Sequence, residues 1–159
     1  MRSYRPPTSK ERWQRLGTTI VEVAVTLPVF MIFMAGLMEC SHAIMVVHSL
    51  NAAARNGARY GATDGISTAQ VNAKVISLTS KVFPATPTIL VKNGSTFDSA
   101  SFNPSTINYS SLPNIELSTA TDDQMFIVRV SVPYNNVALL PPFWIKNITL
   151  TGQSVMRHE

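Results

Sequence analysis

The chain is poor in the residues that build disulfides, metal sites and charged surfaces. Cys40 is its one cysteine among 159 residues, which excludes an intrachain disulfide and any zinc site made of paired cysteines. Charged residues make up 14% of the chain and hydrophobic residues 45%, a balance unlike that of a disordered chain. The length leaves room for one modest domain, or for a short segment joined to a domain of roughly 100 residues.

Positive charge is missing from most of the chain. The first 16 residues carry five basic side chains and one acidic side chain, so this tail accounts for the whole formal net charge of +4. A nucleic-acid-binding domain usually spreads Lys and Arg over a folded face. We therefore expect no nucleic-acid partner.

One long apolar run lies directly after this basic tail. Residues 18–38 are 21 consecutive residues with a single charge, at Glu22. As a helix they would span about 31 Å, close to the hydrocarbon thickness of a bilayer. The basic residues before the run favour a cytoplasmic N-terminus. A cleaved secretory signal and a lipoprotein centred on Cys40 are alternatives, but small residues that would suit either cleavage site do not follow the run.

The helical pattern begins near Ser9 and continues beyond the apolar run to about Gly61. Pro28 should kink this helix, because its ring removes one amide donor and crowds the carbonyl of Ala24. Small residues recur in the last turns and would let another helix approach closely. The alternative is that the glycines only weaken the helix end. The predicted helix-packing residues are Ala54, Gly57, Ala58 and Gly61.

The rest of the chain is predicted to form a small head. Ser67 and Gln70 have capping-box spacing and predict a helix over residues 67–83. Residues 93–113 are rich in Ser, Thr and Asn and should form a loop. Alternation of β-branched and apolar residues predicts strands over residues 88–92, 115–119, 126–134 and 147–156. We therefore predict an α+β fold: a long N-terminal transmembrane helix, then one helix packed on a three- or four-stranded antiparallel sheet.

No group of residues in the sequence suits catalysis or a cofactor. A G-x-S-x-G elbow, a phosphate-binding glycine loop and a convincing acid-base pair are all absent. Glu39 and His42 have the E-x-x-H spacing of di-iron bundles, but the sequence lacks the second pair that such a site needs. We interpret the two residues as a polar belt where the helix leaves the bilayer. We expect no enzyme activity, no metal and no cofactor.

Glu22 is the costly residue of the apolar run. An ionised carboxylate at mid-bilayer costs about 2.5 to 3.5 kcal/mol on insertion scales, so it calls for a partner. Cleavage after Gly17 would create a positively charged amine on Thr18, one turn from Glu22 on the same helix face. This amine could neutralise the carboxylate within a chain or between neighbouring helices. An interfacial glutamate with no role is the alternative.

The N-terminal third resembles the TadE-like family, the pseudopilins of tight-adherence (Tad/Flp) pili. Residues 16–28, LGTTIVEVAVTLP, resemble the family's cleavage site and apolar segment, although Val23 stands where phenylalanine is common. Glu39 follows the apolar run at the family's usual place. Residues 51–59, NAAARNGAR, and the final stretch 148–157 are similar to further family segments.

The resemblance implies a short cytoplasmic leader that a prepilin-type peptidase removes after Gly17, and a role for Glu22 in the registration of subunits. The implied partners are the lipid bilayer, the peptidase, other pilins or pseudopilins and the pilus assembly platform. Mature subunits would enter or prime a thin filament used in adhesion or secretion. The implied location is the bacterial inner membrane, crossed once, with the head outside the cytoplasm.

These expectations divide the chain into four parts, and they leave two other classes of protein open. The parts are a leader (1–17), a transmembrane helix (18–38), a helix extension (39–62) and an extracytoplasmic α+β head (63–159). The first rival is a permanently anchored sensor or binding module whose Ser/Asn-rich loop holds a ligand. The second is a membrane-tethered enzyme. Leader cleavage separates the pilin from the anchored module, because a simple anchor has no need to lose its basic tail.

Overall fold

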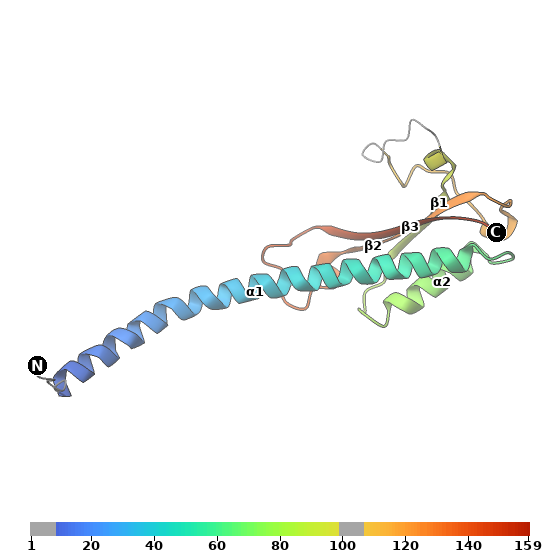
Figure 1. The fold of residues 1–159 in the computed structure, drawn as a ribbon. Coiled ribbons are helices and arrows are strands. Elements are labelled where there is room, and N and C mark those ends of the chain that lie inside the picture. The colour runs from blue at the N-terminus through green and yellow to red at the C-terminus, as the bar shows by residue number, and fades with distance from the viewer. Residues whose placement is uncertain (1–8, 99–106) are drawn as a thin grey trace, which may run out of the picture. The chain divides into compact units, whose positions relative to one another are not determined.

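A single long helix, α1 (Ser9–Gly61), forms the N-terminal third of the protein (Figure 1). The structure, a computed structural model, describes residues 9–98 and 107–159, with side chains from residue 18 onward. The predicted bounds of the long helix are therefore confirmed, whereas residues 1–8 of the predicted leader lie outside the described residues. The helix continues without interruption through Pro28. The kink at Pro28 stays a prediction.

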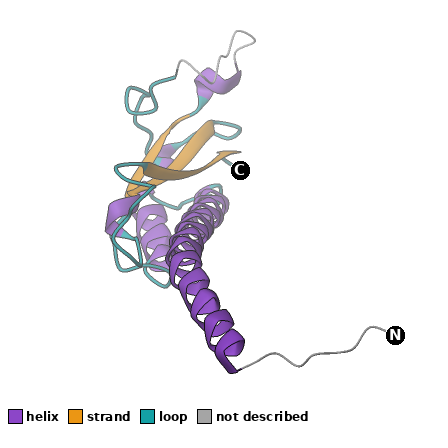
Figure 2. Cartoon of the chain, turned by 90° about the vertical axis from the view of Figure 1, so that its left-hand side faces the viewer, coloured by secondary structure: helices purple, strands orange, loops and turns teal. Residues whose placement is uncertain are grey.

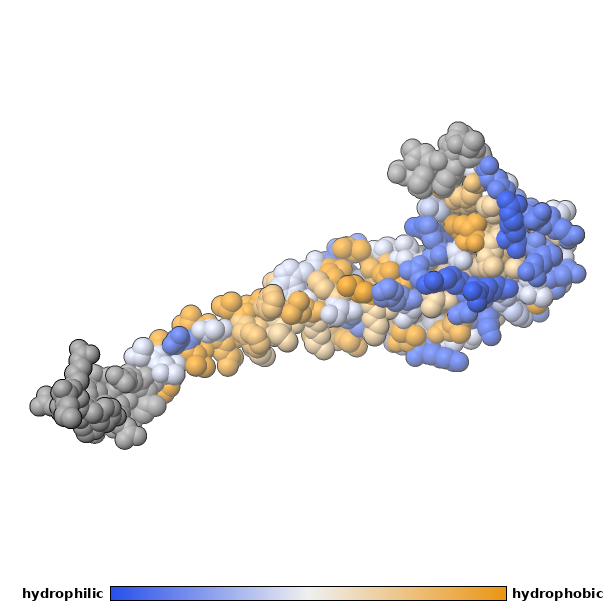
Figure 3. Space-filling view, viewed as in Figure 1, coloured by the Kyte–Doolittle hydropathy of each residue, from blue (hydrophilic) through white to orange (hydrophobic). Residues whose placement is uncertain are grey.

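The chain divides into two compact units, Met1–Met38 and Glu39–Glu159. In the first unit, the side chains of residues 18–38 are almost all exposed although most of them are apolar. Figure 3 shows these side chains as a nearly continuous hydrophobic surface along the helix. Within the described part of the chain, α1 alone is long and apolar enough to cross a membrane. Exposure of this many apolar groups is unfavourable in water and favourable in lipid.

The second unit contains a three-stranded antiparallel sheet with the order β1-β2-β3. The central strand β2 pairs Val128 with Val91 of β1, and Val130 with Gly152 of β3. The strand bounds are β1 (Thr88–Asn93), β2 (Met125–Pro133) and β3 (Thr149–Arg157). The three corresponding predictions are confirmed to within two residues at each end.

Two helical segments cover one face of this sheet (Figure 2): α2 (Thr68–Thr79) and the part of α1 that follows Glu39. Alternate residues of β2 point into this layer, as the two-residue period of the strand requires. The predicted α+β class is thus confirmed, and the structure adds the second half of α1 to the helical layer. The shared core includes Val46, Leu50, Ala54 and Ala58 from α1, Val71 and Val75 from α2, and Phe126, Val128, Val130 and Val132 from β2.

The backbones of α1 and β3 touch at Gly152. A Cβ atom at this position would overlap the backbone of Leu50 and Asn51, so any other residue would push the helix away from the sheet. Beside this contact, the backbone N–H of Gln153 donates a hydrogen bond to Oδ1 of Asn51 at 3.3 Å. Residues 100 positions apart in the sequence are therefore fixed to one another, and the second half of α1 is an integral part of the head.

The helix α2 begins where it was predicted and ends four residues early. Ser67 is its N-cap and forms the predicted capping box with Gln70. The helix ends at Thr79 instead of Phe83, because the residue before a proline is driven out of the helical conformation and Pro84 follows Phe83. Phe83 is instead buried in the core after a turn, where its N–H donates to the carbonyl of Thr79.

The predicted strand over residues 115–119 is wrong. This segment contains a short 3-10 turn, Leu117–Thr119, whose Leu117 side chain is completely buried. The Glu116 carboxylate accepts a hydrogen bond from the backbone N–H of Thr68 at 2.9 Å, at the start of α2. The alternating pattern therefore serves to cap a helix and fill the core, which the local sequence does not reveal.

Candidate functional site

The predicted processing junction lies inside α1. Gly17, Thr18 and Glu22 all belong to the continuous helix, so their spacing places Thr18 and Glu22 one turn apart on one face. The Glu22 side chain is exposed, and the Thr26 hydroxyl donates a hydrogen bond to the Glu22 carbonyl oxygen at 2.7 Å. This arrangement leaves the carboxylate of Glu22 at the helix surface.

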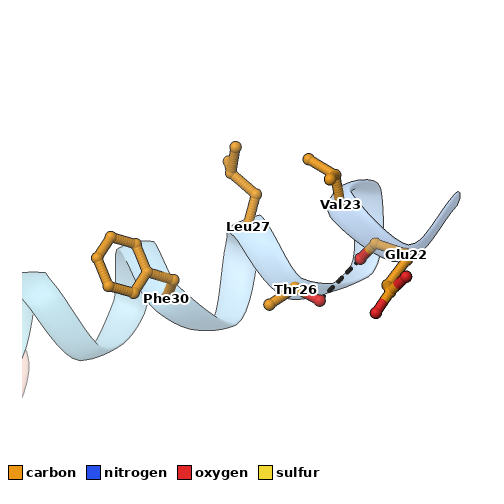
Figure 4. Close-up of a pocket in the computed structure, with 5 residues that line it drawn as sticks. All are labelled: Glu22, Val23, Thr26, Leu27 and Phe30. Atoms are coloured by element: carbon orange, nitrogen blue, oxygen red, sulfur yellow. Dashed lines mark hydrogen bonds between the residues drawn. The ribbon is translucent and has the colours of Figure 1, made fainter. Parts of the chain in front are cut away.

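Glu22 also borders a shallow apolar hollow on the surface of α1. The hollow is lined by Glu22, Val23, Thr26, Leu27 and Phe30. Figure 4 shows Val23 and Leu27 on one side of the helix and the Glu22 carboxylate on the other. An apolar surface of this kind suits a lipid chain or a neighbouring apolar helix.

The small-residue stripe of α1 is buried within the head. Ala54 and Ala58 are fully buried. A Cβ atom on Gly57 would overlap the side chain of Val75, and one on Gly61 would lie 2.8 Å from both Leu117 and Val71. The stripe thus packs against α2 and neighbouring core residues of its own chain. Weakening of the helix end by glycine does not account for these contacts.

The β2–β3 loop, residues 134–148, is fastened to α1 through Glu39. The carboxylate of Glu39 accepts hydrogen bonds from three consecutive backbone N–H groups. The donor–acceptor distances are 3.3 Å for Phe143, 3.1 Å for Trp144 and 2.7 Å for Ile145. A row of amides that converges on one carboxylate is a typical anion-binding arrangement of backbone, here filled by a side chain of the same chain.

The base of the loop is closed by its own hydrogen bonds. The backbone N–H of Tyr134 donates to the carbonyl of Ile148 at 2.8 Å. Nδ2 of Asn135 donates to Oδ1 of Asn147 at 2.9 Å, and the Asn147 N–H donates back to Oδ1 of Asn135 at 3.1 Å. Asn147 has a φ of 56°, a left-handed conformation that asparagine tolerates. The Tyr134 hydroxyl also donates to the Glu39 carbonyl at 3.2 Å, which adds a second link to α1.

The loop amides favour the charged form of Glu39. Partial desolvation raises the pKa of Glu39, but the hydrogen bonds from Ile145, Trp144 and Phe143 and the charge of Lys146 outweigh this effect. Its pKa is therefore lower than the ordinary value of 4.5. Because a carboxylate is a stronger acceptor than a carboxylic acid, ionisation of Glu39 and order in the loop stabilise each other.

Tyr134 and His42 complete this part of the head. Their ring centroids lie 5.9 Å apart. Burial raises the pKa of Tyr134, and the nearby Glu39 and Cys40 raise it further. Within residues 18–98 and 107–159, no three His, Cys, Asp or Glu side chains are grouped so that they could hold a metal ion. Glu39 and His42 therefore lie among loop and core contacts, which the interpretation as a polar belt did not include.

A polar groove lies on the opposite face of the sheet from the helices. It is lined by strand residues that include Ser131 and Thr151, and by residues 107–110 of the Ser/Thr/Asn-rich loop. Arg129 lies 4.1 Å from the ring centroid of Tyr109 and donates to Oε1 of Gln153 at 2.8 Å. The charge of Arg129 is thus already engaged within the groove. An anchored binding module would place its ligand in this groove.

The helix that carries Gly17, Glu22 and Glu39 also carries a family signature. Residues 17–59 match the model of the TadE-like protein family. No match was found among curated proteins or among solved structures. The TadE-like segment begins at the predicted junction and ends within the buried stripe, so the resemblance read from the sequence is confirmed. The match supports a protein associated with tight-adherence pili, and the long apolar helix fits a membrane-anchored chain.

TadE-like pilus components are structural proteins, which agrees with an expectation based on missing catalytic motifs. The sequence pointed to Glu22 and Gly17 but missed the partners of Glu39. Phe143, the first of these partners, is 104 residues away from Glu39. The available signal was the composition of residues 139–145, LLPPFWI, which is apolar yet broken by two prolines. Such a stretch fits neither a strand nor an ordinary polar loop.

We predict that Glu39→Gln loosens the β2–β3 loop. The neutral amide accepts weaker hydrogen bonds, so the amides of residues 143–145 should exchange with solvent roughly tenfold faster at pH 7, relative to their intrinsic rates. Because the pKa of Glu39 is lowered in the folded protein, its stabilisation is present above 4.5 and is lost as the pH falls below that value. Hydrogen exchange followed by mass spectrometry measures both effects.

The variant Asp122→Asn serves as the control, because it neutralises an exposed carboxylate outside the loop. It should leave exchange at residues 143–145 unchanged. Equal exchange in the native protein and in Glu39→Gln at pH 7 would show that the carboxylate does not hold the loop.

Proposed function

We propose that this chain is a pseudopilin of a tight-adherence pilus, acting as a membrane-anchored minor pilin or assembly-priming subunit. One observation carries the proposal: the TadE-like segment coincides with an exposed apolar helix on which Glu22 lies one turn after Thr18. In this proposal residues 1–17 are a cytoplasmic leader and residues 18–38 span the membrane. Residues 39–62 extend the helix, and residues 63–159 form the extracytoplasmic head.

The proposed mechanism begins with removal of the leader. A prepilin-type peptidase cuts the peptide bond between Gly17 and Thr18, and the new N-terminus carries a positive amine. This amine neutralises the Glu22 carboxylate of its own chain or of a neighbour, which offsets the cost of a charge in lipid. The remaining helix surface is apolar, so it can exchange lipid for neighbouring helices with little hydrophobic cost. Pairing at Glu22 then selects the register between subunits.

The proposed orientation follows from the charge around the apolar run. The basic side chains of the first 16 residues stay in the cytoplasm, according to the positive-inside rule. The head is then outside the inner membrane, where it meets other pilins or pseudopilins and the assembly platform. Because the Ala54 to Gly61 stripe is occupied by α2 and Leu117 of the same chain, helix contacts between subunits fall to residues 18–38.

We predict that coexpression with the cognate prepilin peptidase yields a chain that begins at Thr18. The intact mass should fall by the mass of the first 17 residues. Gly17→Leu should block this cleavage, because a bulky side chain would occupy the position before the cut bond. Gly36→Leu is the matched control, a glycine of the same helix that should leave cleavage intact. A chain that keeps Met1 in the presence of active peptidase would contradict the pseudopilin assignment.

We predict that Glu22→Ala inserts into the membrane normally but assembles poorly. Removal of one charge makes the run more apolar, so the carbonate-resistant membrane fraction should not fall. Loss of the pairing that selects register should reduce pilus number by about tenfold or more, if the pairing contributes energy near that of a charge in lipid. Electron microscopy of cells counts the pili. Thr26→Ala is the control, since the Thr26 hydroxyl bonds to its own helix. Normal pilus numbers in Glu22→Ala would remove Glu22 from the mechanism.

The second candidate function is a permanently anchored binding module. The polar groove that includes Ser131 and Thr151 favours it, because hydroxyl groups and the Tyr109 ring line one concave surface. This function needs the membrane helix but not its processing. The same peptidase experiment separates the two functions, because a module that keeps its basic leader and remains in the membrane is an anchor and not a pilin.

A further inference from the structure

The β2–β3 loop displays large apolar side chains to its surroundings. Leu139 is 68% exposed and Phe143 is 69% exposed, and Leu140 and Trp144 are about half exposed. Phe143 and Trp144 contact each other edge to face, with ring centroids 4.7 Å apart. Several large apolar groups gathered on one short segment form a patch that water does not favour.

The exposure of these side chains does not come from a loose loop. Val137 is buried and Ile145 packs against the core, so the loop has an inner side and an outer side. The Glu39 carboxylate fixes the amides of residues 143–145, and the Tyr134 to Ile148 hydrogen bond closes the base. The fold therefore holds the apolar side chains outward at a defined place, and a partner must account for them.

The place where the loop is fastened indicates the partner. Glu39 is the residue that directly follows the apolar run 18–38 in the sequence. If this run spans a bilayer, Glu39 emerges at the surface of the outer leaflet. The loop amides lie within hydrogen-bonding distance of the Glu39 side chain, so the loop is held at the depth of the membrane interface.

The composition of the loop also fits a membrane interface. Residues 134–148 contain no acidic residue and one basic residue, Lys146, whose Nζ atom lies 5.6 Å from the ring centroid of Phe143. Trp favours the headgroup region of bilayers, and Lys is attracted to anionic headgroups. Apolar side chains inserted beside them gain from burial in the boundary with the acyl chains. A protein partner could cover the same patch, but only the bilayer is adjacent to Glu39 in every chain.

We propose that the outer side of the β2–β3 loop, residues 139–144, inserts into the phospholipid interface and holds the head against the outer surface of the membrane. Leu139, Leu140 and Phe143 enter the acyl boundary, Trp144 lies among the headgroups, and Lys146 pairs with an anionic lipid. Glu39 is the positioning residue, because its carboxylate sets the place of the loop. This proposal rests on the membrane anchoring of residues 18–38, but not on cleavage or on pilus assembly.

The experiment measures the depth of Trp144 in the full-length chain. The protein has two tryptophans, so Trp13→Phe leaves Trp144 as the only one. The chain is reconstituted into phosphatidylethanolamine and phosphatidylglycerol vesicles that contain lipids brominated near the headgroup or deep in the acyl chain. We expect the shallow bromines to quench Trp144 fluorescence roughly twice as strongly as the deep ones, and aqueous acrylamide to quench it weakly.

Two further variants test the loop itself. The double change Leu140→Ser and Phe143→Ser removes exposed apolar groups, so the fold should persist while acrylamide quenching of Trp144 rises severalfold. The matched control, Val82→Ser, changes an exposed apolar residue outside the loop and should leave quenching unchanged.

Three outcomes would overturn the proposal, and they are distinguishable. Strong acrylamide quenching of Trp144 in chains that resist carbonate extraction contradicts loop insertion but leaves the membrane anchor in place. Extraction of the chain by carbonate contradicts the anchor itself and with it the insertion. Shielding of Trp144 that disappears when the protein-to-lipid ratio is lowered shows that a second chain, and not lipid, covers the loop.

Discussion

One helix has to satisfy two different surroundings, and the change between them falls at Glu39. Before Glu39, the side chains of α1 are apolar and exposed, a surface suited to lipid. After Glu39, the same helix supplies the centre of a protein core under the sheet. The three amides on the Glu39 carboxylate mark this boundary, because they connect the first residue of the head to the β2–β3 loop.

This division of α1 decides which residues are left for contacts with other molecules. The close approach of Gly152 to Leu50, and of Gly57 to Val75, uses the small residues of α1 inside the chain. Residues 18–38 remain exposed in the described structure, as does the outer side of the β2–β3 loop. Both surfaces are apolar, and the carboxylate of Glu22 is the one acidic group within residues 18–38. A subunit built in this way would meet lipid or neighbouring helices through its N-terminal half.

The sequence predicts those parts of the structure that depend on local patterns. The capping box at Ser67, the alternation in β2 and the length of α1 each follow from residues close together in the chain. The early end of α2 required more weight on Pro84, and the segment 115–119 was misread because its alternation serves a helix cap instead of a strand.

The contacts of the candidate site were harder to predict, because they join residues that are distant in sequence. Glu22 and Thr18 are one helical turn apart, so their relation is visible in the sequence. Glu39 meets its loop about 105 residues later, and no periodicity connects the two. The packing of the small-residue stripe against α2 likewise depends on how the chain folds back, although its close-packing character was legible from the glycines.

The most direct test of a helix shared between membrane and head is hydrogen exchange along α1 in vesicles as denaturant is added. We expect residues 43–58 to lose protection together with β2, because they belong to the same core, while residues 20–36 keep the protection given by lipid. Loss of protection along the whole of α1 in one step would contradict the account, since it would mean that no boundary exists at Glu39.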